Sequence, residues 1–174
     1  MKKKVLIILP DLRIGGAEKN SVIIANELFK KNIEVIFVIK NDINAYSSFL
    51  NSKIKIYSLS VKRLRNIVLP LKNIINQEKP TFIIASMWPL TSLTLISVLL
   101  SKFKPKLYFV EHVPLFISRK YETKSSKFFM KFIINTTYFL AKKIICVSKG
   151  VRDELIKETF INKKKFDVIY NPIS

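Results

Sequence analysis

Two adjacent glycines, Gly15 and Gly16, follow the first apolar run of the chain. Adjacent glycines at a turn from strand to helix let the backbone approach a ligand closely, and the helix N-terminus that follows offers unpaired N–H groups to an anion. The chain has three glycines in all, so finding two of them here favours a ligand-binding loop over a plain tight turn. The loop has neither the G-x-G-x-x-G of dinucleotide sites nor the G-K-[ST] of P-loops.

The only histidine, His112, follows Glu111 directly after the apolar run 107–110. Ligands of open parallel sheets bind beyond the carboxyl ends of the strands, so this position favours a binding role over a purely structural one. With no second histidine and a single cysteine we expect no metal site, because too few ligands are present. No G-x-S-x-G motif exists either, which argues against a nucleophilic triad.

Ser148 and Cys146 have simpler interpretations. Ser148 precedes a helical segment with Asp153 and Glu154 in its early part, so we expect it to cap that helix, with anion binding as the minor alternative. Cys146 lies within an apolar run and is expected to fill the core as a small hydrophobic residue. A lone cysteine excludes an intrachain disulfide.

These residues depend on a regular alternation of elements. Continuous apolar runs, typical of parallel strands buried on both faces, cover residues 5–9, 35–39, 54–57, 82–85, 107–110, 144–147 and 168–170. Segments with helical spacing lie between them, at residues 17–31, 64–75, 90–102, 120–141 and 149–157. Pro70 predicts that the second helix begins or kinks near residue 69. The alternation predicts an α/β domain over residues 1–170, Rossmann-like, with three layers and a mainly parallel sheet.

The ordered motifs resemble the N-terminal domain of family 4 retaining glycosyltransferases. They are KVLIIL (4–9), GGAE (15–18), EH (111–112), VSKGVRDE (147–154) and VIYNPI (168–173). The resemblance implies one half of a two-domain GT-B enzyme of hexosyl-transfer type. Such an enzyme moves a sugar from a nucleotide-sugar donor to a saccharide or lipid-linked acceptor, as in bacterial polysaccharide synthesis, and needs no metal cofactor.

The resemblance also assigns residues. Gly15 and Gly16 would lie beside the donor diphosphate, with Glu18 and Glu111 on the acceptor side. His112 would contact the donor sugar as the catalytic-site residue. Asn171 and Pro172 would begin the interdomain hinge, over residues 171–174.

One feature of the family is missing. Its donor-binding half carries two glutamates eight positions apart, and no two glutamates of this sequence have that separation. We therefore expect the C-terminal donor-binding domain to lie outside this chain and the chain to be inactive alone, either as an excised domain or as part of a split enzyme. A non-catalytic binding or membrane-recruiting subunit of a split transferase is the alternative.

The charge points to an anionic partner. The sequence holds 31 Lys and Arg against 12 Asp and Glu, a net charge of +19. In the helix expected at 120–141, Lys120, Lys124, Lys127 and Lys131 form one stripe, with Phe129, Ile133 and Leu140 expected opposite, facing the sheet. Phe128, Phe132 and Phe139 flank the lysines on one side, with Met130 and Ile134 on the other.

This stripe is open to two interpretations, a solvated face or a surface that docks on an anionic membrane. Docking would place the protein in the cytoplasm, on the inner face of the cytoplasmic membrane. Nucleic-acid binding is the weaker alternative, because no RRM, KH or helix-turn-helix pattern is present. The apolar N-terminal run is five residues long and ends at Pro10, so we expect a strand and not a signal peptide. The apolar residues 90–100 are too few to span a membrane.

Overall fold

The computed structural model describes residues 3–41, 45–118 and 124–172. Its centre is a seven-stranded sheet in the order β3-β2-β1-β4-β5-β6-β7, and every neighbouring pair of strands is parallel. The strands are β1 (Lys4–Leu9), β2 (Glu34–Ile39), β3 (Lys55–Ser58), β4 (Phe82–Ser86), β5 (Lys106–Glu111), β6 (Lys143–Cys146) and β7 (Phe166–Val168). The predicted Rossmann-like α/β fold is therefore confirmed.

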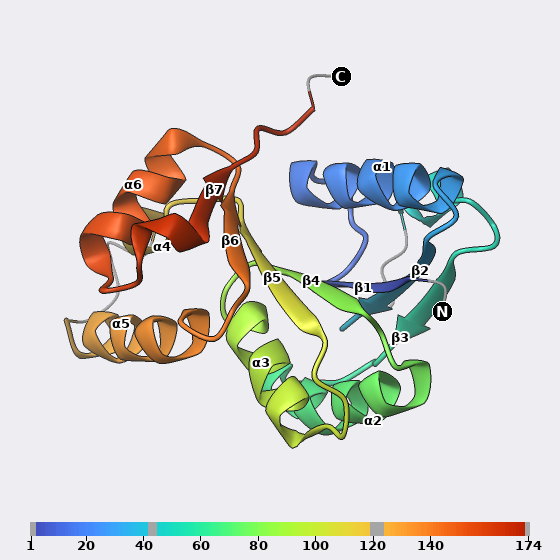
Figure 1. Ribbon diagram of the computed structural model, residues 1–174, viewed down its shortest axis with the longest axis horizontal. Helices are drawn as coiled ribbons and strands as arrows, with labels where there is room; N and C mark the ends of the chain where they lie inside the picture. Colours follow the sequence, from blue (N-terminus) through green and yellow to red (C-terminus); the bar gives the residue numbers. More distant parts are fainter. Residues whose placement is uncertain (1–2, 42–44, 119–123, 173–174) are drawn as a thin grey trace.

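Helices cover the two faces of the sheet unequally (Figure 1). The described helices are α1 (Gly16–Lys30), α2 (Val68–Glu78), α3 (Leu90–Leu100), α4 (Leu115–Ser118), α5 (Lys124–Tyr138) and α6 (Lys149–Glu158), with 3₁₀ turns η1 (Ser47–Phe49), η2 (Leu64–Ile67) and η3 (Lys163–Lys165). Among these, α1 alone packs on one face, over β1 and β2. The other face carries α2, α3, α5 and α6.

Right-handed crossovers explain this imbalance. The chain moves in one direction across the sheet from β1 to β3 and in the opposite direction from β4 to β7, so the two sets of crossover helices lie on opposite faces. The connection from β2 to β3 contributes a 3₁₀ turn in place of a second helix. The α1 face of β4, β5 and β6 is consequently left partly open beside α1.

The last predicted strand was misplaced. It was expected at residues 168–170, whereas β7 spans Phe166–Val168. Phe166 is buried and pairs with Ile144, but three lysines immediately before it hide the start of the strand from a search for apolar runs. Pro70 falls in the first turn of α2, where its missing N–H is tolerated.

The orientation predicted for α5 is wrong. Phe129 and Leu140, expected against the sheet, are exposed, and the buried residues are Met130, Ile134 and Tyr138 at four-residue spacing. The physical reason is that Tyr138 finds hydrogen-bond partners inside, so an amphipathic ring takes a core position that apolar counting gave to phenylalanine. Lys120 lies outside the described residues, and only the helical backbone of Lys124 is described.

Candidate functional site

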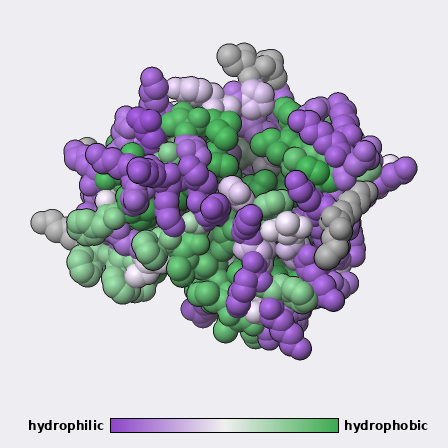
Figure 2. Space-filling view, in the orientation of Figure 1, coloured by the Kyte–Doolittle hydropathy of each residue, from purple (hydrophilic) through white to green (hydrophobic). Residues whose placement is uncertain are grey.

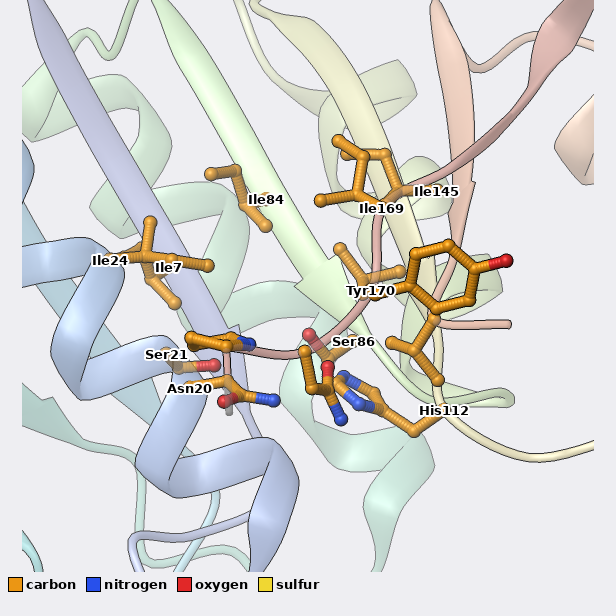
Figure 3. Close-up of a pocket in the computed structure, with 14 residues that line it drawn as sticks. Ile7, Asn20, Ser21, Ile24, Ile84, Ser86, His112, Ile145, Ile169 and Tyr170 are labelled. Carbon is orange, nitrogen blue, oxygen red and sulfur yellow. The ribbon is translucent and has the colours of Figure 1, made fainter. Parts of the chain in front are cut away.

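A pocket of about 180 Å³ opens at the carboxyl ends of the central strands, beside α1 (Figure 3). One part of its wall is apolar, formed by Ile7, Ile24, Ile84, Ile145 and Ile169. The other part is polar and lies at the strand ends, where Asn20, Ser21, Ser86 and His112 meet. The chain segment after β7 closes one side with Asn171 and Pro172. The predicted residues His112, Asn171 and Pro172 thus lie in one pocket.

His112 has hydrogen-bonding capacity that the described protein leaves unused. Neither Nδ1 nor Nε2 of its ring has a hydrogen-bond partner among the described residues, although both atoms are buried. The ring points from the end of β5 toward the α1 side of the pocket (Figure 3). Burial lowers the pKa of His112, which favours a neutral ring at pH 7 with one donor and one acceptor nitrogen.

A second polar side chain in the pocket, Asn20, also has unused hydrogen-bonding capacity. Asn20 is buried on α1, and its Nδ2 has no partner within the described part of the chain. Unsatisfied buried donors and acceptors are uncommon in folded proteins and favour an unseen ligand or water. The pocket lining is mainly apolar, and Asn20 and His112 supply unused donors and acceptors that suit the hydroxyl groups of a ligand.

The sequence did not single out Asn20, Ser21 or Ser86. A signal was nonetheless present, because Asn20 and Ser21 lie at helical spacing from Ala17 and Ile24 and interrupt that apolar stripe. Ser21 donates to the carbonyl of Ala17 at 2.8 Å. Polar residues on a sheet-facing stripe can thus mark a site even when no motif surrounds them.

The glycine loop precedes α1 and lies one turn before the pocket. Gly15 is the N-cap of α1, and the carboxylate of Glu18 stands where a side chain at Gly15 would be, so a larger residue there would displace the Glu18 side chain. Glu18 is buried, whereas the space beside Gly16 is open. Hydrogen bonds from Arg13 hold the pKa of the Asp11 carboxyl below its usual range and fix the start of the loop. Contact of this loop with a diphosphate stays a prediction.

Glu111 and His112 are consecutive, yet they serve opposite sides of the sheet. Glu111 is fully buried; its carboxylate accepts hydrogen bonds from Tyr138 and, at 3.4 Å, from the backbone N–H of Trp88. It does not line the His112 pocket. An acceptor-side role for Glu111 stays a prediction, and the role the contacts show is to join β5, α5 and the segment after β4.

The remaining predicted residues behave structurally. Ser148 caps α6 by accepting from the N–H of Val151 at 3.2 Å, as expected. Cys146 is buried, and its burial together with the charge of Glu111 raises the pKa of the thiol to about 12. Within the described ranges, no group of three or more His, Cys, Asp and Glu residues is placed to hold a metal ion.

Solved structures with the same fold include glycosyltransferases and UDP-N-acetylglucosamine 2-epimerases. HepE from Anabaena, determined with UDP and glucose, superposes with a TM-score of 0.71 at 18% identity, covering 99% of this chain and 45% of its own. A glycosyltransferase from Rickettsia africae gives a TM-score of 0.70 at 14% identity, with coverage of 97% and 43%. The lipopolysaccharide outer core galactosyltransferase WaaB gives 0.64 at 17%, with coverage of 98% and 46%.

These identities establish a shared fold, and the chain spans less than half the length of each of these neighbours. No curated protein sequence matches the chain. The family model of Glycosyltransferase Family 4, by contrast, matches residues 14–174, which is nearly the whole sequence and includes Gly15, Gly16, His112 and the residues that line the pocket except Ile7. The chain therefore belongs to glycosyltransferase family 4.

Proposed function

We propose that this chain is the acceptor-side domain of a retaining glycosyltransferase whose donor is a nucleotide sugar and whose acceptor is a saccharide or lipid-linked saccharide. The observation that carries the proposal is His112, whose two buried ring nitrogens lack partners in a pocket at the carboxyl ends of the strands. A neutral imidazole there can bond hydroxyl groups of the transferred sugar. The UDP held by the similar HepE structure supports a nucleotide donor.

The geometry supports separate roles for this domain and for a second domain in binding the donor. Asn20 and His112 provide polar contacts on this side of the donor sugar, and Gly16 leaves room for the donor phosphates at the start of α1. The groups that bind the nucleotide base would come from a second domain. We therefore propose that this polypeptide alone transfers no sugar.

The test uses the complete two-domain enzyme that contains this domain. His112→Ala should lower kcat/KM for transfer by about 100-fold or more, since preorganised polar contacts to a transition state contribute on that order. His112→Asn, which keeps one donor and one acceptor, should recover part of the loss. An unchanged melting temperature separates this effect from misfolding, and NMR of the product anomer tests retention.

The outcome that rejects the proposal is a near-normal transfer rate in a folded His112→Ala enzyme. Product formation by the 174-residue chain alone, with a panel of nucleotide sugars and membrane acceptors, would reject the division between two domains. Recovery of activity on mixing with a separate donor-binding polypeptide would identify a split transferase.

We further propose that the domain works on the inner face of the cytoplasmic membrane. Phe128, Phe132 and Phe160 are exposed around a shallow hollow that also contains Lys131 and Asn135. Apolar side chains gather over α5 and α3 on this face of the molecule (Figure 2). Exposed aromatic residues beside lysines favour the boundary between lipid and water.

The structure changes the part that the lysines play. Lys127 and Lys131 lie 3.8 and 3.7 Å from the Glu158 carboxylate, and their ammonium groups stand over the rings of Phe116 and Phe160. They are therefore held against α6 and do not extend freely as a stripe. The aromatic side chains supply the docking surface in this proposal, and the lysines supply a net positive charge around it.

A further inference from the structure

A second hollow lies across the sheet from the His112 pocket, in the layer formed by η2, α3 and α5. It has a volume of about 380 Å³, within the range of small-molecule sites. Its wall is mainly apolar, with Leu64, Trp88, Leu93, Ile96, Phe129 and Ile133 around it. Phe129 and Ile96 remain exposed, so the hollow is an open groove (the α3–α5 groove).

One end of the groove is cationic. Arg65 lines it, and Lys62 and Arg63 precede it in the loop that follows β3. All three side chains are exposed, and no described carboxylate lies within salt-bridge distance of them. The sequence contains no Asp or Glu between residues 43 and 77. The positive charge at this end is therefore not balanced locally.

An apolar groove with Arg65 in its lining and two further cations just before it in the chain complements an amphiphile that has one hydrocarbon chain and an anionic head. One guanidinium group can donate two parallel hydrogen bonds to two oxygens of a phosphate, so a phosphate ester is the head group that matches arginine best. We propose that the α3–α5 groove binds the hydrocarbon chain of a lipid phosphate and that Arg65 binds its phosphate, with Lys62 and Arg63 adding positive charge nearby in the chain. That this lipid phosphate is the acceptor of sugar transfer rests on the proposed function, whereas its binding in the groove does not.

The end of β5 connects the groove to the transfer site. Glu111 holds the backbone of Trp88, in the groove wall, and the hydroxyl of Tyr138 on α5, while the next residue, His112, faces the sugar pocket. Each hollow is lined by a residue that follows the carboxyl end of a central strand, Trp88 after β4 and His112 after β5. Met87, just before Trp88, has φ 68°, an uncommon conformation for a residue other than glycine that is found preferentially at functional sites. A lipid chain anchored in the groove would thus bring its head group to the edge where sugar is transferred.

The protein carries its own reporter for this test. Trp88 is the only tryptophan of the sequence and lines the groove. Titration of the 174-residue chain with monomeric decyl phosphate, without vesicles, should produce a saturable change in tryptophan fluorescence. Decanol should bind about tenfold more weakly or worse, since hydrogen bonds to a charged group are lost, and inorganic phosphate should produce no comparable change.

Two pairs of variants locate the ligand. Arg65→Gln should weaken decyl phosphate by about tenfold and leave decanol unchanged, whereas Lys53→Gln, at an exposed site elsewhere, should change neither. Ile96→Gln should weaken both ligands, while Leu100→Gln, exposed on the same helix outside the groove, should weaken neither. Melting temperatures confirm that all four variants are folded.

Equal affinities for decyl phosphate and decanol would overturn the phosphate assignment. Unchanged binding by Ile96→Gln would overturn the groove, and a fluorescence change seen with anionic vesicles alone would identify docking on the bilayer in its place. If decyl phosphate does not bind but His112→Ala lowers sugar transfer, the lipid phosphate proposal is rejected and the transferase proposal stands. If His112→Ala transfers sugar normally and decyl phosphate still binds, the transferase proposal is rejected and the lipid phosphate proposal stands.

Discussion

At the scale of single residues, Tyr138 shows how a polar group organises the edge of the site. Its hydroxyl is buried, lies 2.8 Å from the hydroxyl of Thr91 and donates to the Glu111 carboxylate. Burial, with the neighbouring charge of Glu111, raises the pKa of Tyr138 far above its ordinary value, so the hydroxyl remains a donor at any physiological pH. The ring also packs on Phe109, with centroids 4.9 Å apart.

Tyr138→Phe should therefore destabilise the domain although it removes a single oxygen atom. The buried carboxylate of Glu111 and the hydroxyl of Thr91 both lose a partner, which should lower the free energy of unfolding by about 1–3 kcal/mol. Urea denaturation measures the change. Tyr170→Phe, at an exposed position, is the matched control and should have little effect. Equal stabilities of Tyr138→Phe and the unsubstituted chain would show that water replaces the lost bonds.

The sequence indicated the position of His112 but not its surroundings. Its place after a strand was enough to predict the pocket, because strand ends of a parallel sheet converge at one edge. That both ring nitrogens would be buried without partners depended on which side chains α1 turns toward the sheet. The spacing of Asn20 on α1 marked it as a polar residue on an apolar stripe, but only the three-dimensional structure brings it into one pocket with Ser86 and His112.

At the scale of elements, strands were easier to predict than helix faces. Six of the expected strands overlap closely with β1 to β6. Strands of a parallel sheet are buried on both faces, so they appear in the sequence as short continuous apolar runs. The wheel of α5 failed because its phenylalanines, Phe128, Phe129 and Phe132, remain in solvent, while Met130, Ile134 and Tyr138 are buried. The short helix α4 was not predicted, since four residues hold too little periodic pattern.

Glu78 offers a test of how elements are joined. As the last residue of α2, it accepts hydrogen bonds from Lys4 at 2.8 Å, Lys55 at 2.8 Å and Tyr57 at 2.5 Å, and so ties α2 to β1 and β3. Burial alone would raise the pKa of Glu78, but the bonds from Lys4, Lys55 and Tyr57 outweigh it and lower the pKa to about 2. The folded state thus keeps this carboxylate charged at pH values where the unfolded chain is protonated.

Glu78→Gln should lower the free energy of unfolding at pH 7 by about 1 kcal/mol. The variant should also lose less of that free energy than the unsubstituted chain when the pH falls. A lowered folded pKa contributes stability that is complete above the ordinary pKa near 4.5 and disappears as the pH falls toward 2. Urea denaturation at intervals from pH 7 to 2 should therefore show the two proteins converging. Asp153→Asn, exposed on α6, is the control expected to keep the acid loss of the unsubstituted chain. Parallel curves for Glu78→Gln would contradict the assigned role.

At the scale of the whole molecule, charge and apolar surface must be considered together. A net charge of +19 attracts any polyanion over a distance set by ionic strength, and by itself does not distinguish a membrane from nucleic acid. In the membrane proposal, the exposed rings of Phe128, Phe132 and Phe160 supply the apolar contact that charge alone lacks. In the part of the chain that the structure describes, no helix is long and apolar enough to cross a bilayer.

We expect the chain to sediment with anionic vesicles and to bind neutral vesicles poorly. Binding should weaken as added salt shortens the Debye length from ~10 Å at 0.1 M to ~3 Å at 1 M. Phe128→Ser with Phe132→Ser should weaken sedimentation, whereas Phe49→Ser with Leu69→Ser, two exposed apolar sites elsewhere, should not. Glutamine at Lys120, Lys124, Lys127 and Lys131 should weaken it too, because each lysine near the surface adds about 1 kcal/mol. Stronger binding to DNA or RNA at matched ionic strength would reject the membrane proposal.

The central position of β1 also bears on how the chain folds during synthesis. Among the strands of this sheet, β1 is made first and has β2 on one side and β4 on the other, so one of its edges stays unpaired until β4 has been made. After β4 has paired with β1, each new strand pairs with its immediate predecessor. The nascent sheet can therefore grow along a single advancing edge, in the order of translation, while β3 remains its other edge.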